Sequence, residues 1–125
     1  RRVAADAARY GAAVPAIAAV DSLREVETDA QGEITASHIV DRRRFRSVQT
    51  PQIFRAELLR KAYGAPYRPE FTDDASVVEQ AGEAVFLCEG ERTNLKITTP
   101  EDMVIAEALL AGREKTEEDT DGENL

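Results

Sequence analysis

The chain has 125 residues, a length that fits one domain or a large part of one. Its 24 acidic and 16 basic residues give a formal net charge of −8, which argues against a general nucleic-acid-binding protein. No apolar run approaches the roughly 20 residues of a membrane-spanning helix, so we expect no membrane partner. One cysteine, Cys88, and one histidine, His38, exclude an intrachain disulfide, a multi-cysteine zinc site and a multi-histidine metal site.

The N-terminal third of the chain predicts a helix, a buried strand and a polar ribbon. Residues 1–10 are rich in alanine and arginine and precede Gly11, which indicates a helix that ends at this glycine. The apolar run at 12–20 predicts a strand buried on both faces, and Pro15 within it indicates an edge strand or a bulge. Residues 21–41 predict two strands around a turn, polar on both faces. Such a ribbon is marginal by itself, so it should lie on its own domain or on a partner subunit.

The following segment alternates irregular chain, helices and one apolar strand. Thr72 and Thr99 each precede acidic residues and are predicted to cap helices. The last helix is expected to bury Val104, Ile105, Ala108 and Leu109. This alternation predicts an α/β fold. The predicted elements are irregular chain at 42–53, a helix at 54–63, a helix from Asp73 to Gly82, a strand at 84–90, a strand or turn at 94–98, and a helix from Pro100 to about 111.

The C-terminal residues 113–125 differ from the rest in charge and pattern. They hold two basic and six acidic residues, which is half of the net charge, and they show no apolar period. We predict a solvated, disordered tail here and a folded part over residues 1–112. An acidic interaction tail is the alternative interpretation of the same residues.

Few residues could carry chemistry when the sequence is considered by itself. Four arginines at 42–46 form a basic patch in an acidic chain, which indicates either a bound anion or a solvated loop with surface ion pairs. Lys96 lies near a strand end, where α/β proteins bind ligands, although a lysine that snorkels to solvent fits as well. No glycine-rich phosphate loop is present, so this chain should not bind a nucleoside triphosphate by itself.

Three segments resemble one enzyme family when they are taken in order and at their observed separations. They are VDRRRFRSVQTPQIF at 40–54, FTDDAS at 71–76 and NLKITTPEDMVIAEALL at 94–110. Together they resemble the C-terminal half of 2-C-methyl-D-erythritol 4-phosphate cytidylyltransferases, and the resemblance covers residues 1–112. It implies the C-terminal portion of a Rossmann-like nucleotidyltransferase fold, with a protruding two-stranded β-arm at 21–41 that joins two subunits into a homodimer.

The resemblance also implies a reaction, and it assigns roles to particular residues. The family transfers CMP from CTP to 2-C-methyl-D-erythritol 4-phosphate with Mg²⁺ and releases pyrophosphate, in non-mevalonate isoprenoid biosynthesis; we expect a cytoplasmic enzyme. Arg42 matches the arginine that holds the substrate phosphate, and Lys96 matches the lysine that orients this phosphate for attack. Both are expected catalytic residues. The expected substrate-binding hydroxyls are those of Ser22, Thr50 and Thr72, with Ser22 standing where the family usually has threonine.

This sequence departs from the family pattern at a few positions and lacks one whole part. Asp74 stands where glutamate is more common, and Arg46 where an aromatic residue is common. The family's glycine-rich CTP loop is absent, so we expect a C-terminal fragment that is inactive alone, with the Mg²⁺ ligands in the missing half. We also expect Arg42 of one subunit to approach Lys96 of the other. Two alternatives stay open: a ribitol-5-phosphate cytidylyltransferase and a non-catalytic dimerisation module.

Overall fold

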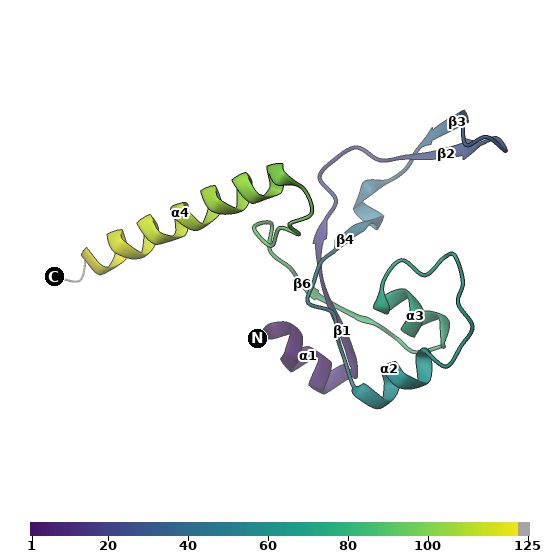
Figure 1. Cartoon of the computed structure of the whole chain (residues 1–125), viewed down its shortest axis with the longest axis horizontal. Coiled ribbons are helices and arrows are strands. Elements are labelled where there is room, and N and C mark those ends of the chain that lie inside the picture. The colour runs from purple at the N-terminus through teal and green to yellow at the C-terminus, as the bar shows by residue number, and fades with distance from the viewer. Residues whose placement is uncertain (123–125) are drawn as a thin grey trace. The chain divides into compact units, whose positions relative to one another are not determined.

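The protein divides into two units, Arg1–Gly90 and Glu91–Leu125, and each is considered by itself. The structure, a computed structural model, describes the backbone of residues 1–122 and the side chains of residues 1–117 and 120. Figure 1 shows the order of the helices and strands. None of the helices in this described part has the length and hydrophobicity that a membrane span needs.

The first unit begins with the predicted helix and buried strand. Helix α1, Arg2–Tyr10, ends at Gly11, whose φ of 89° is the left-handed conformation that glycine adopts at no steric cost. Strand β1, Ala12–Ala18, follows directly, and its first five residues are buried. Tyr10 stacks on Phe86 with ring centroids 4.1 Å apart, which fixes the helix end against the sheet.

Strand β1 lies at the centre of a four-stranded mixed sheet. Strands β4, Arg46–Val48, and β5, Ile53–Phe54, pair with it antiparallel along one side. Strand β6, Phe86–Glu89, pairs with it parallel along the other side and ends the described sheet there. A strand with neighbours on both sides and helices around it explains the continuous small-apolar run. The predicted α/β class is therefore confirmed.

The prediction that Pro15 lies on an edge strand is wrong, but a bulge-like irregularity does lie opposite it, because two residues of β1 face four residues between β4 and β5. Pro15 sits in the middle of the central strand, opposite Cys88 of β6. Its carbonyl accepts a hydrogen bond from the backbone N–H of Gln49 at 2.8 Å, so its ring nitrogen points to the same side. On that side Pro15 faces the segment between β4, which ends at Val48, and β5, which begins at Ile53. The missing proline donor therefore falls where the ladder on this side of β1 is interrupted between two short strands.

The predicted polar ribbon is confirmed as a two-stranded arm. Strands β2, Arg24–Thr28, and β3, Ile34–Ile39, pair antiparallel. The Asp29 carboxylate closes the turn by accepting the backbone N–H groups of Gln31 at 2.9 Å and Glu33 at 3.0 Å. Every residue of β2 is exposed, so the arm has no core of its own. Figure 1 shows it extending away from the four-stranded sheet.

A short helical turn and two helices complete the first unit. The 3₁₀ turn η1, Arg42–Arg44, leads from the arm into β4, within a segment predicted to be irregular throughout. Helices α2, Ala56–Ala62, and α3, Asp74–Gln80, lie side by side beyond β5. The core joins them to β1. Its buried members are Ala12, Ala62, Val77 and Val78, with Phe54, Leu58, Leu59, Phe71 and Val85 partly buried around them.

The second unit is a loop followed by one long helix, α4, Pro100–Gly122. Residues 94–98 form no strand. Thr99 caps the helix as predicted: its hydroxyl accepts the N–H of Asp102 at 3.3 Å, and the Asp102 carboxylate accepts the N–H of Thr99 at 3.0 Å. The backbone N–H of Thr98 also donates to this carboxylate, and with the bonds from Thr99 it lowers the pKa of Asp102 below its usual value.

The predicted end of the last helix near residue 111 is wrong, because α4 continues through residues 113–122 of the predicted tail. The reason is helix propensity. Glu114, Lys115 and Glu117 are strong helix formers even without an apolar face, and the hydroxyl of Thr116 donates to the carbonyl of Gly112 at 3.0 Å. Residues 123–125 of the predicted tail lie outside the described residues.

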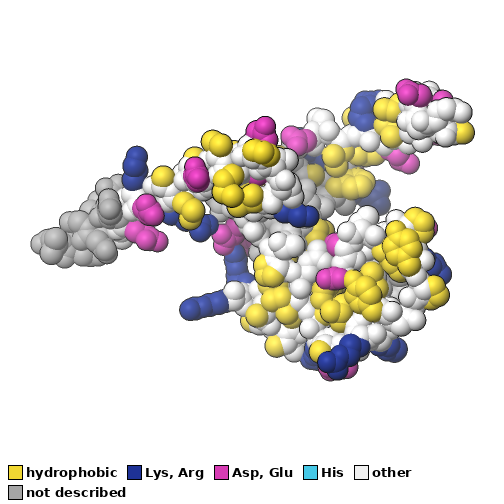
Figure 2. All heavy atoms as spheres, in the orientation of Figure 1, with side chains coloured by type: hydrophobic (Ala, Val, Ile, Leu, Met, Phe, Trp, Pro, Cys, Tyr) yellow, Lys and Arg dark blue, Asp and Glu magenta, His cyan; other side chains and the backbone are white. Residues whose placement is uncertain are grey.

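The expected burial along α4 is also corrected. Val104 is 67% and Ile105 49% exposed, Ala108 is exposed as well, and Leu109 alone of the four is partly buried. Figure 2 shows hydrophobic side chains on the surface of α4. The helical period places these four residues on one face, but a period does not say whether another element covers that face.

Candidate functional site

An open groove of about 680 Å³ lies in the first unit, between the loop that follows β4 and the start of α3. Two residues predicted to bind substrate, Thr50 and Thr72, both line it, although 22 positions separate them. The Thr50–Pro51 peptide bond is cis. Tyrosine and phenylalanine side chains form much of the remaining wall, and Figure 2 shows hydrophobic side chains gathered over α3 and the loop before it. The groove offers two hydroxyl groups beside an apolar wall.

The start of α3 is held by Asp73, so the predicted capping role of Thr72 is wrong. One carboxylate oxygen of Asp73 accepts the backbone N–H of Ser76 at 2.9 Å. The Ser76 hydroxyl in return accepts the backbone N–H of Asp73 at 3.2 Å, and it also accepts that of Thr72 at 3.0 Å and donates to the Asp73 carbonyl at 2.7 Å. This reciprocal arrangement is a capping box with serine in its third helical position. The side chain of Thr72 is thereby left to face the groove.

Gln52 connects the two sides of the groove. Its side-chain N–H donates to the second carboxylate oxygen of Asp73 at 2.9 Å, and its carbonyl oxygen accepts the backbone N–H of Ala75 at 3.2 Å. Burial of Asp73 raises the pKa of its carboxyl, but the hydrogen bonds from Gln52 and Ser76 outweigh burial and bring the pKa below the usual value. Asp73 therefore remains a carboxylate near neutral pH.

A tyrosine hydroxyl and a carboxylate meet in the lining of the groove. The Tyr63 hydroxyl donates a hydrogen bond to the carboxylate of Asp74, and both residues line the groove. This bond raises the pKa of Tyr63, with smaller contributions from desolvation and from the negative charges of Asp74 and Asp73. Tyr63 thus stays protonated and serves as a donor. Sequence reasoning missed Gln52, Tyr63 and Asp73 as groove residues, because their partners are set by the fold.

Ser22 precedes the first strand of the arm and Arg42 follows the second, and neither is part of the groove's lining. Arg42 donates through Nη1 to the backbone carbonyl of Val20 at 2.6 Å, which holds it beside the segment that carries Ser22. Both side chains are exposed. The structure therefore brings two of the five predicted site residues, Thr50 and Thr72, together in one groove. The fifth, Lys96, belongs to the second unit.

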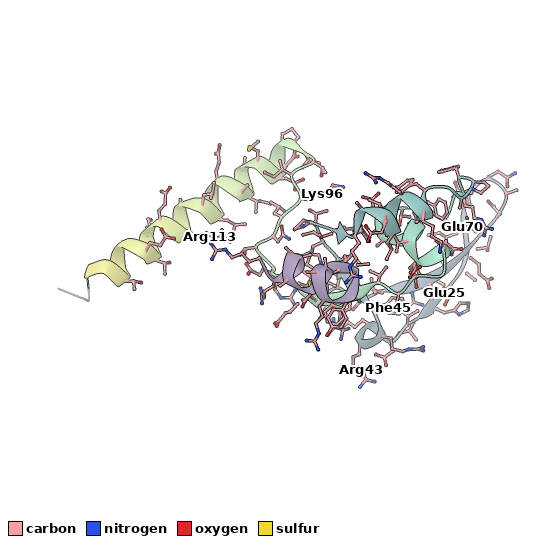
Figure 3. The ribbon with its side chains drawn as sticks, turned by 90° about the horizontal axis from the view of Figure 1, so that it is seen from below. Glu25, Arg43, Phe45, Glu70, Lys96 and Arg113 are labelled. Carbon is pink, nitrogen blue, oxygen red and sulfur yellow. The ribbon has the colours of Figure 1, made fainter. Side chains whose placement is uncertain are left out.

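The arginines that follow Arg42 are engaged locally. Arg43 forms a two-pronged ion pair with Asp41, at 2.9 and 3.0 Å, and its side chain is 87% exposed, pointing into solvent in Figure 3. The pair lowers the pKa of Asp41 and raises that of Arg43. Arg46 donates to the carbonyls of Arg43 and Phe45, each at 2.9 Å. The open alternative of a loop with surface ion pairs thus describes Arg43, whereas Arg42 donates to a backbone carbonyl.

Lys96 lies on the loop before α4, and Figure 3 shows its side chain projecting from that loop. It is exposed, three residues before the cap at Thr99. In the described part of the chain no three histidine, cysteine, aspartate or glutamate side chains gather into a set that could hold a metal ion.

Comparison with known proteins gives this geometry a family. Residues 1–112 match the family model described as 2-C-methyl-D-erythritol 4-phosphate cytidylyltransferase. Among solved structures, the enzyme of that description from Thermus thermophilus superposes with a TM-score of 0.66 at 44% identity, covering 86% of this chain and 52% of that one. The fold is thus that of a Rossmann-like nucleotidyltransferase.

Curated relatives agree. A 2-C-methyl-D-erythritol 4-phosphate cytidylyltransferase of Bacteroides thetaiotaomicron is 49% identical over 104 residues, 83% of this chain and 45% of the relative. One from Rubrobacter xylanophilus is 49% identical over 105 residues, 82% of this chain and 43% of the relative. The chain belongs to the 2-C-methyl-D-erythritol 4-phosphate cytidylyltransferase family. It spans about half the length of the curated relatives it matches.

Proposed function

We propose that the full-length protein containing this chain transfers CMP from CTP to 2-C-methyl-D-erythritol 4-phosphate. The products are 4-diphosphocytidyl-2-C-methyl-D-erythritol and pyrophosphate, and the reaction serves isoprenoid biosynthesis by the non-mevalonate route. The observation that carries the proposal is the groove. The family match covers residues 1–112, and two hydroxyl residues singled out by that resemblance line one cavity of the first unit.

The proposed chemistry is an in-line attack of a substrate phosphate oxygen on the α-phosphorus of CTP. Such a reaction depends on positioning and charge neutralisation more than on covalent help from the protein. In this proposal Arg42 grips the attacking phosphate with its forked donors, and Lys96 orients the same phosphate. Ser22, Thr50 and Thr72 bind the hydroxyls of the polyol, and the aromatic wall of the groove excludes water on one side.

The proposed assembly is a homodimer in which each site takes residues from both subunits. The arm supports this because its strands are exposed and have no core within the described chain. Ser22 and Arg42 sit at the arm base and outside the groove lining, as expected if they serve the partner's groove. We propose that Arg42 of one subunit approaches Lys96 of the other.

Mg²⁺, the nucleotide site and the location of the enzyme belong to the same proposal. Since the described residues gather no metal-ligand set, we propose that Mg²⁺ arrives with the CTP phosphates and is held by residues outside this chain. The glycine-rich CTP loop is placed there too, so the 125-residue chain alone should not turn over CTP. We propose that the enzyme works in the cytoplasm.

A turnover assay on the full-length protein tests the reaction. Pyrophosphate release is measured with CTP, Mg²⁺ and either 2-C-methyl-D-erythritol 4-phosphate or ribitol 5-phosphate. We expect turnover of the first substrate and a fall on the order of 10²-fold or more for Arg42→Ala and for Lys96→Ala. Arg60→Ala and Lys61→Ala, which remove the same charges from the exposed side of α2, should stay near wild type. Absent turnover, or a preference for ribitol 5-phosphate, would contradict the proposal.

A mixing experiment tests the shared site. When Arg42→Ala and Lys96→Ala proteins are unfolded and refolded together, half of the dimers carry one copy of each variant. Such a mixed dimer has one intact site if the two cations come from different subunits. Activity should then return to roughly a quarter of wild type. Activity that stays at the level of the separate variants would show that each site is built within one subunit.

A further inference from the structure

The two threonine hydroxyls of the groove lie on different loops. The distance between them therefore depends on contacts between these loops. Thr50 lies on the loop between β4 and β5, and Thr72 lies on the loop before α3. The two loops are 22 positions apart, and no strand of the described sheets pairs them. A positional error of about 1 Å in groups that orient a substrate can cost a large factor in rate. A bridge between the loops would therefore matter for binding.

The carboxamide of Gln52 forms such a bridge with both of its ends. Its N–H group donates to Asp73 at 2.9 Å, and its oxygen accepts the N–H of Ala75 at 3.2 Å. This pattern fixes the orientation of the amide, because the flipped amide would set oxygen against carboxylate and N–H against N–H. Gln52 stands two residues after Thr50, and Asp73 directly follows Thr72. The bridge thus ties together the two segments that carry the hydroxyls.

The bridge continues on the far side of Asp73. The other carboxylate oxygen accepts the N–H of Ser76, whose hydroxyl in turn accepts the backbone N–H of Thr72 at 3.0 Å. Gln52 and Asp73 are both partly buried, which strengthens their charge-assisted bond relative to one in water. The backbone of Thr72 is therefore linked to the loop of Thr50 through three side chains.

We infer that Gln52 is a positioning residue, which sets the distance between the Thr50 and Thr72 hydroxyls and so the affinity for the polyol phosphate. This role rests on the proposed function. Gln52 acts through Asp73 and the two threonines. Its loss should raise the KM for the polyol phosphate and leave the KM for CTP unchanged, because CTP is proposed to bind outside this chain.

An exchange of donor and acceptor between Gln52 and Asp73 tests the bridge in the full-length enzyme. Gln52→Glu sets two carboxylates against each other, and Asp73→Asn sets two N–H groups against each other. Each single variant should raise the KM for 2-C-methyl-D-erythritol 4-phosphate on the order of tenfold. In the double variant the amide introduced at position 73 donates to the carboxylate introduced at position 52 while its oxygen still accepts the N–H of Ser76. KM should then return toward wild type.

Gln80→Glu, which makes the same change of charge at the exposed end of α3, is the matched control for Gln52→Glu. It touches neither threonine loop and should leave both KM values at the wild-type level. A rise in KM from Gln80→Glu equal to that from Gln52→Glu would assign the effect to added negative charge and overturn the positioning role.

The outcomes separate the positioning role from the proposed function. If wild type turns over the polyol phosphate and the double variant is as poor as the sum of its parts, the positioning role is wrong. Single variants with unchanged KM overturn it equally. If thermal melting shows that a single variant is unfolded, the recovery of both fold and low KM in the double variant still decides the matter. If wild type neither binds nor converts the polyol phosphate, the proposed function fails and the positioning role fails with it.

Discussion

The groove and the arm are built from neighbouring parts of the first unit, yet they hold their shapes in different ways. Behind the groove, α2 and α3 share a core with β1 in which Val78 is fully buried and Ala62 nearly so. The arm has no such core, and it relies on its strand ladder and on the turn closed by Asp29. Burial stabilises the first region, whereas the second depends on local hydrogen bonds that water competes for.

The groove is therefore expected to be rigid, whereas the arm is exposed and available to a partner. The proposed substrate groove needs fixed distances, and a packed core with a capping box supplies them. The proposed role of the arm in joining two subunits requires strands that stay uncovered in the single chain, and every residue of β2 is exposed. Equivalent substitutions should therefore have unequal effects in the two regions.

The largest expected effect comes from the same truncation made in both regions. Val78→Ala opens a cavity under α3 and should lower the free energy of unfolding by about 2 kcal/mol. Val26→Ala, at a position 46% exposed on the arm, should change it by less than about 0.5 kcal/mol. Urea unfolding of each variant, with the slope checked for constancy, measures both. Equal losses would show that the arm folds as part of the core.

An intermediate effect should come from two glycines with positive φ. Gly11 joins α1 to β1 at φ 89°, and Gly32 lies in the arm turn at φ 82°. Alanine is strained at both, by about 1 kcal/mol. Gly11→Ala should therefore lower the global unfolding free energy by about that amount. Gly32→Ala should leave it unchanged and speed amide hydrogen exchange in β2 and β3 only. A lower global free energy of unfolding for Gly32→Ala would show that the arm unfolds together with the core.

The smallest effect should be the acid dependence of Asp73. Its folded-state pKa lies below the unfolded value of about 4, so its charge stabilises the fold above that pH and this contribution is lost as the pH falls through the folded pKa. Asp73→Asn should flatten the loss of stability between about pH 6 and pH 3. Asp41→Asn at the arm base is the comparison: its exposed pair with Arg43 should respond to added salt, and Asp73 should not. A salt response of equal size at both sites would contradict this.

Elements with a local signal could be predicted from the sequence. Gly11 follows an alanine-rich run and so marks a helix end, and the turn chemistry of Asp29 and Gly32 defines the arm within a few residues. Strands β4 and β5 have three and two residues, and only their pairing with β1 makes them strands. The error at Pro15 has the same origin, since the gap that tolerates it lies in a neighbouring chain segment.

The residues of the candidate site also differ in whether the sequence could predict them. The family resemblance placed Thr50 and Thr72, and the structure shows both on one groove. The segment Thr72-Asp73-Asp74 offers three side chains that could cap a helix, and serine three residues after Asp73 was the available signal for the correct one. Gln52 gave no signal, because its partners are 21 and 23 positions away. The local sequence around a polar side chain does not predict its hydrogen-bond partners from distant parts of the chain.

Strand β6 has one neighbour in the described sheet, so its other edge presents backbone donors and acceptors outward. Such an edge recruits further strands, including those of other copies in concentrated solution. The formal charge of −8 opposes this by mutual repulsion between copies. Salt shortens the reach of that repulsion to about 8 Å at physiological ionic strength. Self-association of the 125-residue chain in solution thus depends on two opposing factors, the unpaired edge of β6 and the net negative charge. A rise in ionic strength should favour association.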